Sequence, residues 1–378
     1  MNLWKLALTI AVSVLAALTL GWNPSTPSGP TVRAATQVDL TTLVAPERVG
    51  LDAAPLEELA RRAEAGYWGR VDSVHVARRG QLAFERHFRG YDGQTPHRMY
   101  SVTKSVTSLL VGIALDQGHI PGLDRTLLSF FPEYAVDDIA NMDERKARIT
   151  LDDLLTMRAG FRWDEWTFPY TDPRNDTTPL FASDDWMKHM LDLPMAHEPG
   201  TVFTYSSGVT MLLSGILRNA TGMTAREFAA EHLFGPLGIT QFGWEEGPDG
   251  IFNTGWGLFL KPRDMLRLGQ LVLDGGRWDG VQVVPEDWVR QSTLPTVVRS
   301  STTGYGFQWW TMPLLGQSGR SSTLADVPYA AGWGGQHIFV VPALELVVAV
   351  TGANYQGAPR SPRTMVFDFV APAVDDGV

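Results

Sequence analysis

Strand-like segments lie at both ends of this 378-residue chain, whereas helical segments fill its middle. Near the start, two alternating runs at 71–78 and 81–87 predict a β-hairpin. Further strands are predicted near the other end, at 305–310, 329–341 and 344–351. Strands from distant parts of a chain bury their apolar faces by sharing a sheet, so we expect one sheet with a helical insertion packed against it.

This pattern divides the chain into regions. We expect 35–110 and 250–378 to form the α/β sheet region, and 111–249 to form the helical region. The longest irregular stretch, 162–181, lies within the helical region and is rich in aromatic residues. Because long loops are often functional, we expect it to overhang a binding pocket.

The composition excludes several classes of protein. Hydrophobic residues make up 44% and charged residues 19%, so the chain can bury a core and is not intrinsically disordered. The formal net charge of −10 argues against nucleic-acid binding, which depends on clustered Lys and Arg. The absence of cysteine excludes disulfides, zinc–thiolate sites and a thiol nucleophile. The eight histidines show no metal-ligand spacing, so we expect neither a metal nor a cofactor.

The first 34 residues have the pattern of a targeting segment. Lys5 precedes a mostly apolar stretch, 6–20, and a Pro/Ser/Thr-rich run follows it. The apolar stretch is short for a bilayer span, which takes about 20 residues. We therefore predict a signal peptide, with an uncleaved N-terminal anchor as the alternative. Either way we expect an extracytoplasmic protein, secreted or periplasmic, that contacts a membrane only if the segment is uncleaved.

Ser101 and Lys104 form the clearest candidate for catalysis. Residues three apart on a helix lie on one face, about 5–6 Å apart, and a helix is predicted over 101–117. A lysine whose pKa is depressed by burial can take the proton of a serine, whose hydroxyl is otherwise a weak nucleophile. A capping serine beside a solvated lysine would give the same pattern. The predicted helix is apolar nearly all round, however, which indicates that Lys104 is buried.

Two further segments could complete such a site. Tyr205 precedes a predicted helix, and a phenol next to a lysine ammonium can have its pKa lowered and act as a base or proton relay. The segment 330–336 is rich in small residues, which let a substrate approach a strand edge where a backbone N–H can complete an oxyanion hole. Each pattern also fits an ordinary structural role: Tyr205 as a tyrosine at the start of a helix, and 330–336 as a glycine-rich turn.

Five sequence motifs, which occur in the same order as in a known family, carry a family resemblance. They lie at 99–105, 149–156, 198–205, 233–239 and 262–278. Together they resemble the serine β-lactamase and penicillin-binding-protein superfamily, and within its class C-related hydrolases the esterase and 6-aminohexanoate-dimer-hydrolase-like branches. The resemblance covers about 71–354. It implies a β-lactamase/transpeptidase-like fold of the α/β (α+β) class, in which an antiparallel sheet is flanked by helices and carries an all-helical insertion domain.

The resemblance also implies roles for individual residues. Ser101 is expected to be the acylated nucleophile, Lys104 its activating partner, and Tyr205 the second base or proton relay. The strand motif of the family falls on Ala330-Ala331-Gly332, which makes the backbone N–H groups of Ser101 and Trp333 the expected oxyanion hole. A rival register places the motif at 333–335, with Gln336 supplying the second N–H.

Two positions depart from the lactamase pattern. Ser207 stands where lactamases keep an asparagine, and Ala330 stands where they keep a cationic or imidazole residue. A β-lactam or D-Ala-D-Ala peptide presents a carboxylate, which a positive group holds best. We expect aromatic residues to favour an uncharged acyl group instead. Together with Ser207, the expected substrate-binding residues are Trp166, Tyr170 and Trp310.

From these observations we expect a secreted serine hydrolase that cleaves ester or small amide bonds through an acyl-enzyme intermediate. Its partner would be a small-molecule ester or amide. One alternative is a D-Ala-D-Ala carboxypeptidase or β-lactamase, which the missing cation at Ala330 disfavours. Another is a catalytically inactive binding or sensor module on the same scaffold, which the intact set of Ser101, Lys104 and Tyr205 disfavours.

Overall fold

The computed structural model describes residues 38–314, 323 and 325–375. The predicted signal peptide or anchor, 1–34, lies outside the described residues. Within the described ranges, no helix combines the length and the apolar character that crossing a membrane requires.

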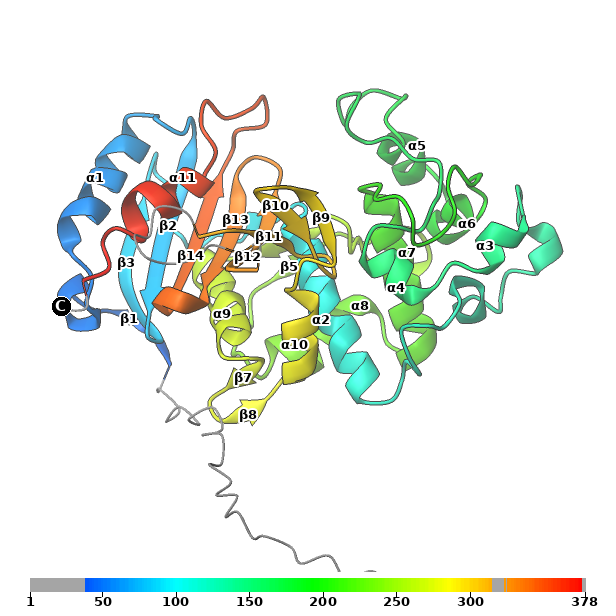
Figure 1. Ribbon diagram of the computed structural model, residues 1–378, viewed down its shortest axis with the longest axis horizontal. Helices are drawn as coiled ribbons and strands as arrows, with labels where there is room; N and C mark the ends of the chain where they lie inside the picture. Colours follow the sequence, from blue (N-terminus) through cyan, green and yellow to red (C-terminus); the bar gives the residue numbers. More distant parts are fainter. Residues whose placement is uncertain (1–37, 315–322, 324, 376–378) are drawn as a thin grey trace, which may run out of the picture. The chain divides into compact units, whose positions relative to one another are not determined.

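One sheet of nine strands organises the described chain, in the order β1-β3-β2-β14-β13-β12-β11-β10-β9 (Figure 1). Only the β1–β3 pair is parallel; the other neighbours run antiparallel. The strands are β1 (Asp39–Leu43), β2 (Val71–Arg78), β3 (Gln81–His87), β9 (Val297–Ser300), β10 (Thr303–Tyr305), β11 (Trp310–Met312), β12 (Val327–Gly332), β13 (Gln336–Val341) and β14 (Leu346–Gly352).

The two ends of the chain meet in the middle of this sheet. Strand β14 pairs with β2, with Val348 opposite Val76, and every residue of both strands is buried. Burial on both faces explains why β14 reads as a nearly continuous apolar run instead of an alternating one.

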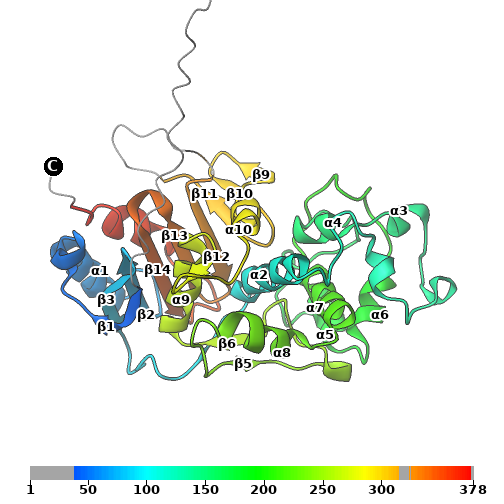
Figure 2. The same cartoon turned by 90° about the horizontal axis from the view of Figure 1, so that it is seen from below.

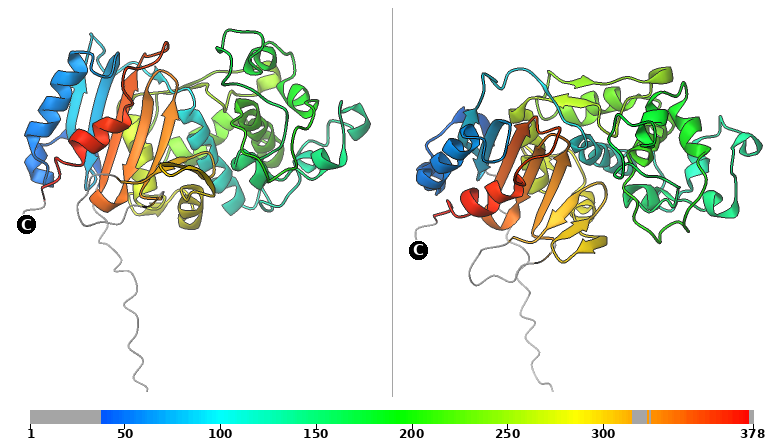
Figure 3. Two further views of the ribbon diagram at one scale, coloured as in Figure 1. Left: turned by 45° about the horizontal axis from the view of Figure 1, so that its top comes forward. Right: turned by 90° about the horizontal axis from the view of Figure 1, so that it is seen from above.

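Helices cover both faces of the sheet (Figures 1 and 3). One face packs against α1 (Ala53–Glu64) and the C-terminal segment that contains α11 (Arg363–Met365). The other face packs against α2 (Val102–Asp116), α9 (Pro262–Leu273) and α10 (Glu286–Ser292). The predicted fold class, an antiparallel sheet flanked by helices with a helical insertion, is confirmed.

The helical segments gather beyond α2, which contacts both α7 and β12 and lies between the large sheet and these helices (Figure 2). They are α3 (Glu144–Ala147), α4 (Leu151–Leu155), α5 (Thr177–Phe181), α6 (Trp186–Leu191), α7 (Ser207–Thr221) and α8 (Ala225–Ala229). Short strands complete the fold: β4 (His97–Arg98), β5 (Gly243–Trp244) and β6 (Leu258–Leu260) form a three-stranded sheet, and β7 (Arg277–Trp278) pairs with β8 (Val281–Gln282).

Two predicted strands are hairpins in the structure. The segment 305–310 turns between β10 and β11, where Gly306 N–H bonds to the Trp309 carbonyl. The segment 329–341 divides into β12 and β13 around Gly334 and Gly335, which have φ values of +86° and +104°. Only glycine adopts such φ values freely, so these two residues fix the turn.

Candidate active site

Ser101 stands at the N-terminal end of α2, next to a cavity. The helix is buried on all sides from Val102 to Ala114, because the large sheet lies on one side and the helical region on the other. This burial fixes the position of Ser101. The preceding residue, Tyr100, has a φ of +47°, a value that few non-glycine residues adopt and that often marks a functional turn.

Lys104 lies one turn further along α2 and is almost completely buried, with 1% of its surface exposed. Its Nζ donates to three oxygens: to Ser101 Oγ at 3.1 Å, to Ser207 Oγ at 2.8 Å and to the Gly255 carbonyl at 2.7 Å. Burial lowers the pKa of Lys104 to about 8, although the negative charge of Glu165 acts in the opposite direction. A neutral amine can therefore be populated beside Ser101 close to neutral pH.

Glu165 is a member of the site that the sequence analysis missed. It belongs to the loop 162–181 and is buried. One carboxylate oxygen accepts the backbone N–H of Ser207 at 2.6 Å and the indole N–H of Trp163 at 2.8 Å. The other accepts the Ser207 hydroxyl at 2.9 Å and the Tyr170 hydroxyl at 3.4 Å. No spacing rule links Glu165 to Lys104; only the fold brings them together.

Tyr205 lies beside Lys104, as predicted, but the pKa of its phenol shifts in the opposite direction from the one predicted. Its ring is buried, lies 5.0 Å from Lys104 Nζ and stacks on Trp166 and Trp310. Burial raises the pKa of the Tyr205 phenol well above its usual value, and the charge of Glu165 adds to this, although a hydrogen bond with Ser101 lowers it. The expected lowering of this pKa is therefore wrong, and Tyr205 holds its proton at neutral pH.

The strand motif lies at the end of β12. Ala330 is fully buried and faces the core, so no cation stands at this position. Gly332 packs against the start of α2: a Cβ atom on it would lie 2.2 Å from the Met99 carbonyl oxygen. Trp333 follows and lines the cavity. Gln336, on which the rival register depends, is buried and binds both polar backbone groups of Gly352.

A cavity of about 330 Å³ opens beside Ser101. Of the predicted substrate-binding residues, Tyr170 and Ser207 line it, whereas Trp166 and Trp310 support the ring of Tyr205. The lining is mainly aromatic, hydroxyl-bearing or charged: Arg98, Tyr100, Ser101, Tyr170, Thr171, Thr177, Thr178, Phe181, Ser207, Glu245, Trp256 and Trp333.

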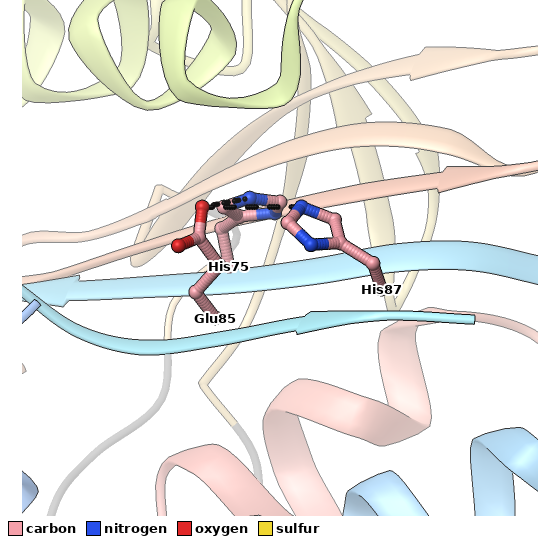
Figure 4. A group of neighbouring side chains, drawn as sticks. All are labelled: His75, Glu85 and His87. Carbon is pink, nitrogen blue, oxygen red and sulfur yellow. Dashed lines mark hydrogen bonds and ion pairs between the residues drawn. The ribbon is translucent and has the colours of Figure 1, made fainter. Parts of the chain in front are cut away.

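His75 and His87, whose spacing in the sequence does not match a metal-binding motif, lie side by side on the large sheet (Figure 4). Glu85 Oε1 lies 2.9 Å from His75 Nε2 and 3.9 Å from His87 Nε2, a set of side chains that could hold a metal ion. The guanidinium of Arg263 already binds both oxygens of Glu85, at 2.8 and 2.6 Å. This fixed positive charge opposes the binding of a cation, so we assign the contacts of Glu85 with His75 and Arg263 to a structural hydrogen-bond network.

Comparison with known proteins supports a family assignment. Residues 56–364 match the family model described as Beta-lactamase. The chain is 26% identical over 321 residues to the 6-aminohexanoate-dimer hydrolase of Paenarthrobacter ureafaciens, which covers 76% of this chain and 71% of that protein. It is 30% identical over 194 residues to the lovastatin esterase of Penicillium rubens, covering 47% of this chain and 46% of that protein.

A solved structure shows the same fold. The penicillin-binding protein homologue from Caulobacter crescentus aligns with a TM-score of 0.61 at 19% identity, over 82% of this chain and 93% of that one. The match to the family model includes all five sequence motifs on which the resemblance depended. The resemblance to the serine β-lactamase and penicillin-binding-protein superfamily is therefore confirmed. The chain belongs to the Beta-lactamase family.

Proposed function

We propose that this protein is a serine hydrolase that cleaves ester or small amide bonds through an acyl-enzyme on Ser101. Membership of the Beta-lactamase family supports hydrolase activity, and the relatives named lovastatin esterase and 6-aminohexanoate-dimer hydrolase support the bond type. The observation that carries the proposal is the buried Lys104, whose Nζ lies 3.1 Å from Ser101 Oγ and whose pKa is lowered to about 8.

Lys104 acts as the base that activates Ser101. As an ammonium it donates one proton to each of its three oxygen partners. As a neutral amine it keeps the bonds to Ser207 and Gly255 and turns its lone pair toward Ser101 Oγ. It then takes the serine proton while Oγ forms a bond to the substrate carbonyl carbon.

Tyr205 acts as the proton donor in acylation. Its phenol is protonated at neutral pH and interacts with Ser101, so it can protonate the departing alkoxide or amine as the carbonyl–leaving-group bond breaks. The proton held by Lys104 then restores the phenol. In deacylation, water attacks the acyl carbon, the same groups move its proton in the reverse order, and the acid product leaves.

The developing oxyanion is held by the backbone N–H groups of Ser101 and Trp333. The contact of Gly332 with the Met99 carbonyl supports this register, because it brings the end of β12 against the turn that presents Ser101. Gln336 is buried and pairs with Gly332 across the β12–β13 hairpin, which speaks against the rival register. Such donors are effective because they are already oriented when charge develops.

The strand motif favours esters and small amides over β-lactams or D-Ala-D-Ala peptides. Ala330 provides no cation on β12, where the family resemblance places the group that holds a substrate carboxylate. The predicted targeting segment, 1–34, supports an extracytoplasmic site of action.

A substrate panel tests the proposal. Purified protein is incubated with p-nitrophenyl butyrate, nitrocefin and a short-chain anilide, and with a fluorophosphonate probe. We expect ester turnover above nitrocefin turnover, and labelling of the wild type but not of Ser101→Ala. Equal labelling of the two proteins would remove Ser101 from the mechanism, and nitrocefin turnover that matches ester turnover would favour the lactamase alternative.

A further inference from the structure

The cavity that contains Ser101 is also lined by two charged side chains, Arg98 and Glu245. We propose that Arg98 is a carboxylate-binding subsite, so that the enzyme prefers esters or amides that carry a second, free carboxylate. This inference rests on the proposed function, because it concerns the substrate of the same cavity. It places the cation of the site on β4 instead of β12.

The backbone fixes both charged residues at the cavity wall. Arg98 ends β4 and pairs with Phe259 of β6. Glu245 follows β5 on the other side of β6, and its N–H bonds to the Gly257 carbonyl at 2.9 Å. The guanidinium also lies over the ring of Tyr100, 5.0 Å from the ring centre. Arg98 is therefore held in place before any ligand binds.

Most hydrogen-bond donors of Arg98 are unused. Its Nη2 donates to the two carboxylate oxygens of Glu245, at 3.1 and 3.0 Å. Its Nε is buried without a partner in the described chain, and Nη1 has no acceptor among the described residues. A guanidinium carries five N–H donors in a rigid fork that matches a carboxylate. Because Nε is buried, a ligand carboxylate in the cavity would accept from Nη1, whose donors the described chain leaves free.

Glu245, in contrast, is already well supplied with donors. Besides Arg98, the side-chain amide of Asn253 donates to Glu245 Oε2 at 2.7 Å. A cationic substrate group would have to compete with both of these partners. Glu245 is thus a positioning residue, which orients the guanidinium and partly neutralises it. The pair selects an anion more readily than a cation.

Two pairs of esters, matched except for charge, test the subsite. In 4-acetoxybenzoate and its methyl ester, the carboxylate is in the leaving group. In mono-p-nitrophenyl adipate and p-nitrophenyl hexanoate, it is at the end of the acyl chain. We expect kcat/KM to favour the charged member of at least one pair. Arg98→Met should reduce that preference about ten- to a hundredfold, the range expected for a charged hydrogen bond.

Glu245→Gln should have the opposite effect to Arg98→Met and strengthen the preference for the charged ester. It removes the competing carboxylate and keeps a side chain that can bond to Arg98, so KM for the charged ester should fall. Arg290→Met is the matched control, because Arg290 is exposed on α10 and, among the described residues, is paired only with Asp287 on its own helix. It should change neither preference. A gain in activity toward amine-bearing esters that is lost in Glu245→Gln would overturn the assignment to Arg98.

The results separate this inference from the proposed function. Turnover of the neutral esters, lost in Ser101→Ala, with no charge preference in the wild type would overturn the carboxylate subsite alone. If none of the esters is turned over, calorimetric binding of 4-acetoxybenzoate and its methyl ester to Ser101→Ala still decides. Tighter binding of the charged ligand, abolished by adding Arg98→Met, supports the subsite; equal binding overturns it.

Discussion

Glu165 accepts two hydrogen bonds from Ser207, one from the backbone N–H at 2.6 Å and one from the hydroxyl at 2.9 Å. The hydroxyl proton of Ser207 is thereby committed to Glu165, which leaves its oxygen to accept from Lys104 Nζ at 2.8 Å. The negative charge is thus connected to the base through one side chain. It raises the pKa of Lys104, against the larger effect of burial.

Glu165→Gln should therefore move the rising limb of the kcat/KM pH profile toward lower pH. Without the carboxylate, only burial acts on Lys104, and its pKa falls further. The control is Asp172→Asn in the same loop, where the carboxylate pairs with Arg174 on the surface. An unshifted limb in Glu165→Gln would show that Glu165 has only a structural role.

The wild-type profile should itself rise with pH until about 8. The neutral form of Lys104 is the active one and its pKa is lowered to about 8, so kcat/KM should fall about tenfold per unit below that value and level off above it. Steady-state rates on p-nitrophenyl butyrate between pH 5 and 10 measure this. Replacing His97 or His189 in turn should leave the limb in place. Its loss in a folded histidine variant would point to a serine–histidine mechanism.

Tyr205→Phe separates proton donation from packing. The phenylalanine ring can keep the stacking on Trp166 and Trp310, so the melting temperature should change little. Loss of the hydroxyl should reduce kcat/KM, which reports the acylation step, by about 10²–10⁴-fold for alkyl esters and anilides. The loss should be much smaller for p-nitrophenyl esters, whose leaving group departs without a proton. An equal loss on both kinds of substrate would contradict the assignment of Tyr205 as the proton donor.

Gly332→Ala tests the oxyanion register. The new Cβ would lie 2.2 Å from the Met99 carbonyl oxygen, so the end of β12 must move away from Ser101. Losing one oxyanion donor costs about 10²–10³-fold in kcat. Gly243→Ala on β5 is the control, because its Cβ meets Phe259 at an ordinary 3.4 Å. Circular dichroism checks that both variants fold, and wild-type activity in folded Gly332→Ala would favour the register at Gln336.

Sequence patterns predicted the helices and hairpins whose formation depends on residues close together in the chain. The helix predicted over 101–117 is α2, because its apolar residues occur on every side and its ends carry turn-forming residues. The hairpin at 71–78 and 81–87 is β2 and β3 with the predicted bounds. The strand predicted over 329–341 was wrong at its centre, since alternation continues through Gly334 and Gly335 and conceals the turn.

Contacts between distant segments could not be predicted in this way. Glu165 reaches Lys104 through Ser207, and Arg98 reaches Glu245 across β6, although nothing in their spacing marks either pair. His75 and His87 meet because β2 and β3 pair in one particular register, which the alternating pattern alone does not specify. The direction of the Tyr205 pKa shift was also missed, since it depends on how deeply the fold buries the phenol.

The pairing of β2 with β14 has a consequence for the synthesis of the enzyme. It joins residues 71–78 to 346–352, so the centre of the sheet closes only after the chain has been made as far as residue 352. Contacts between such distant residues close slowly, because the loop between them must lose its entropy first. Until then the hairpin of β2 and β3 is not joined to β13 and β12, the strands against which α2 packs. We therefore expect the support of α2 and Ser101 to be completed only once β14 has been made.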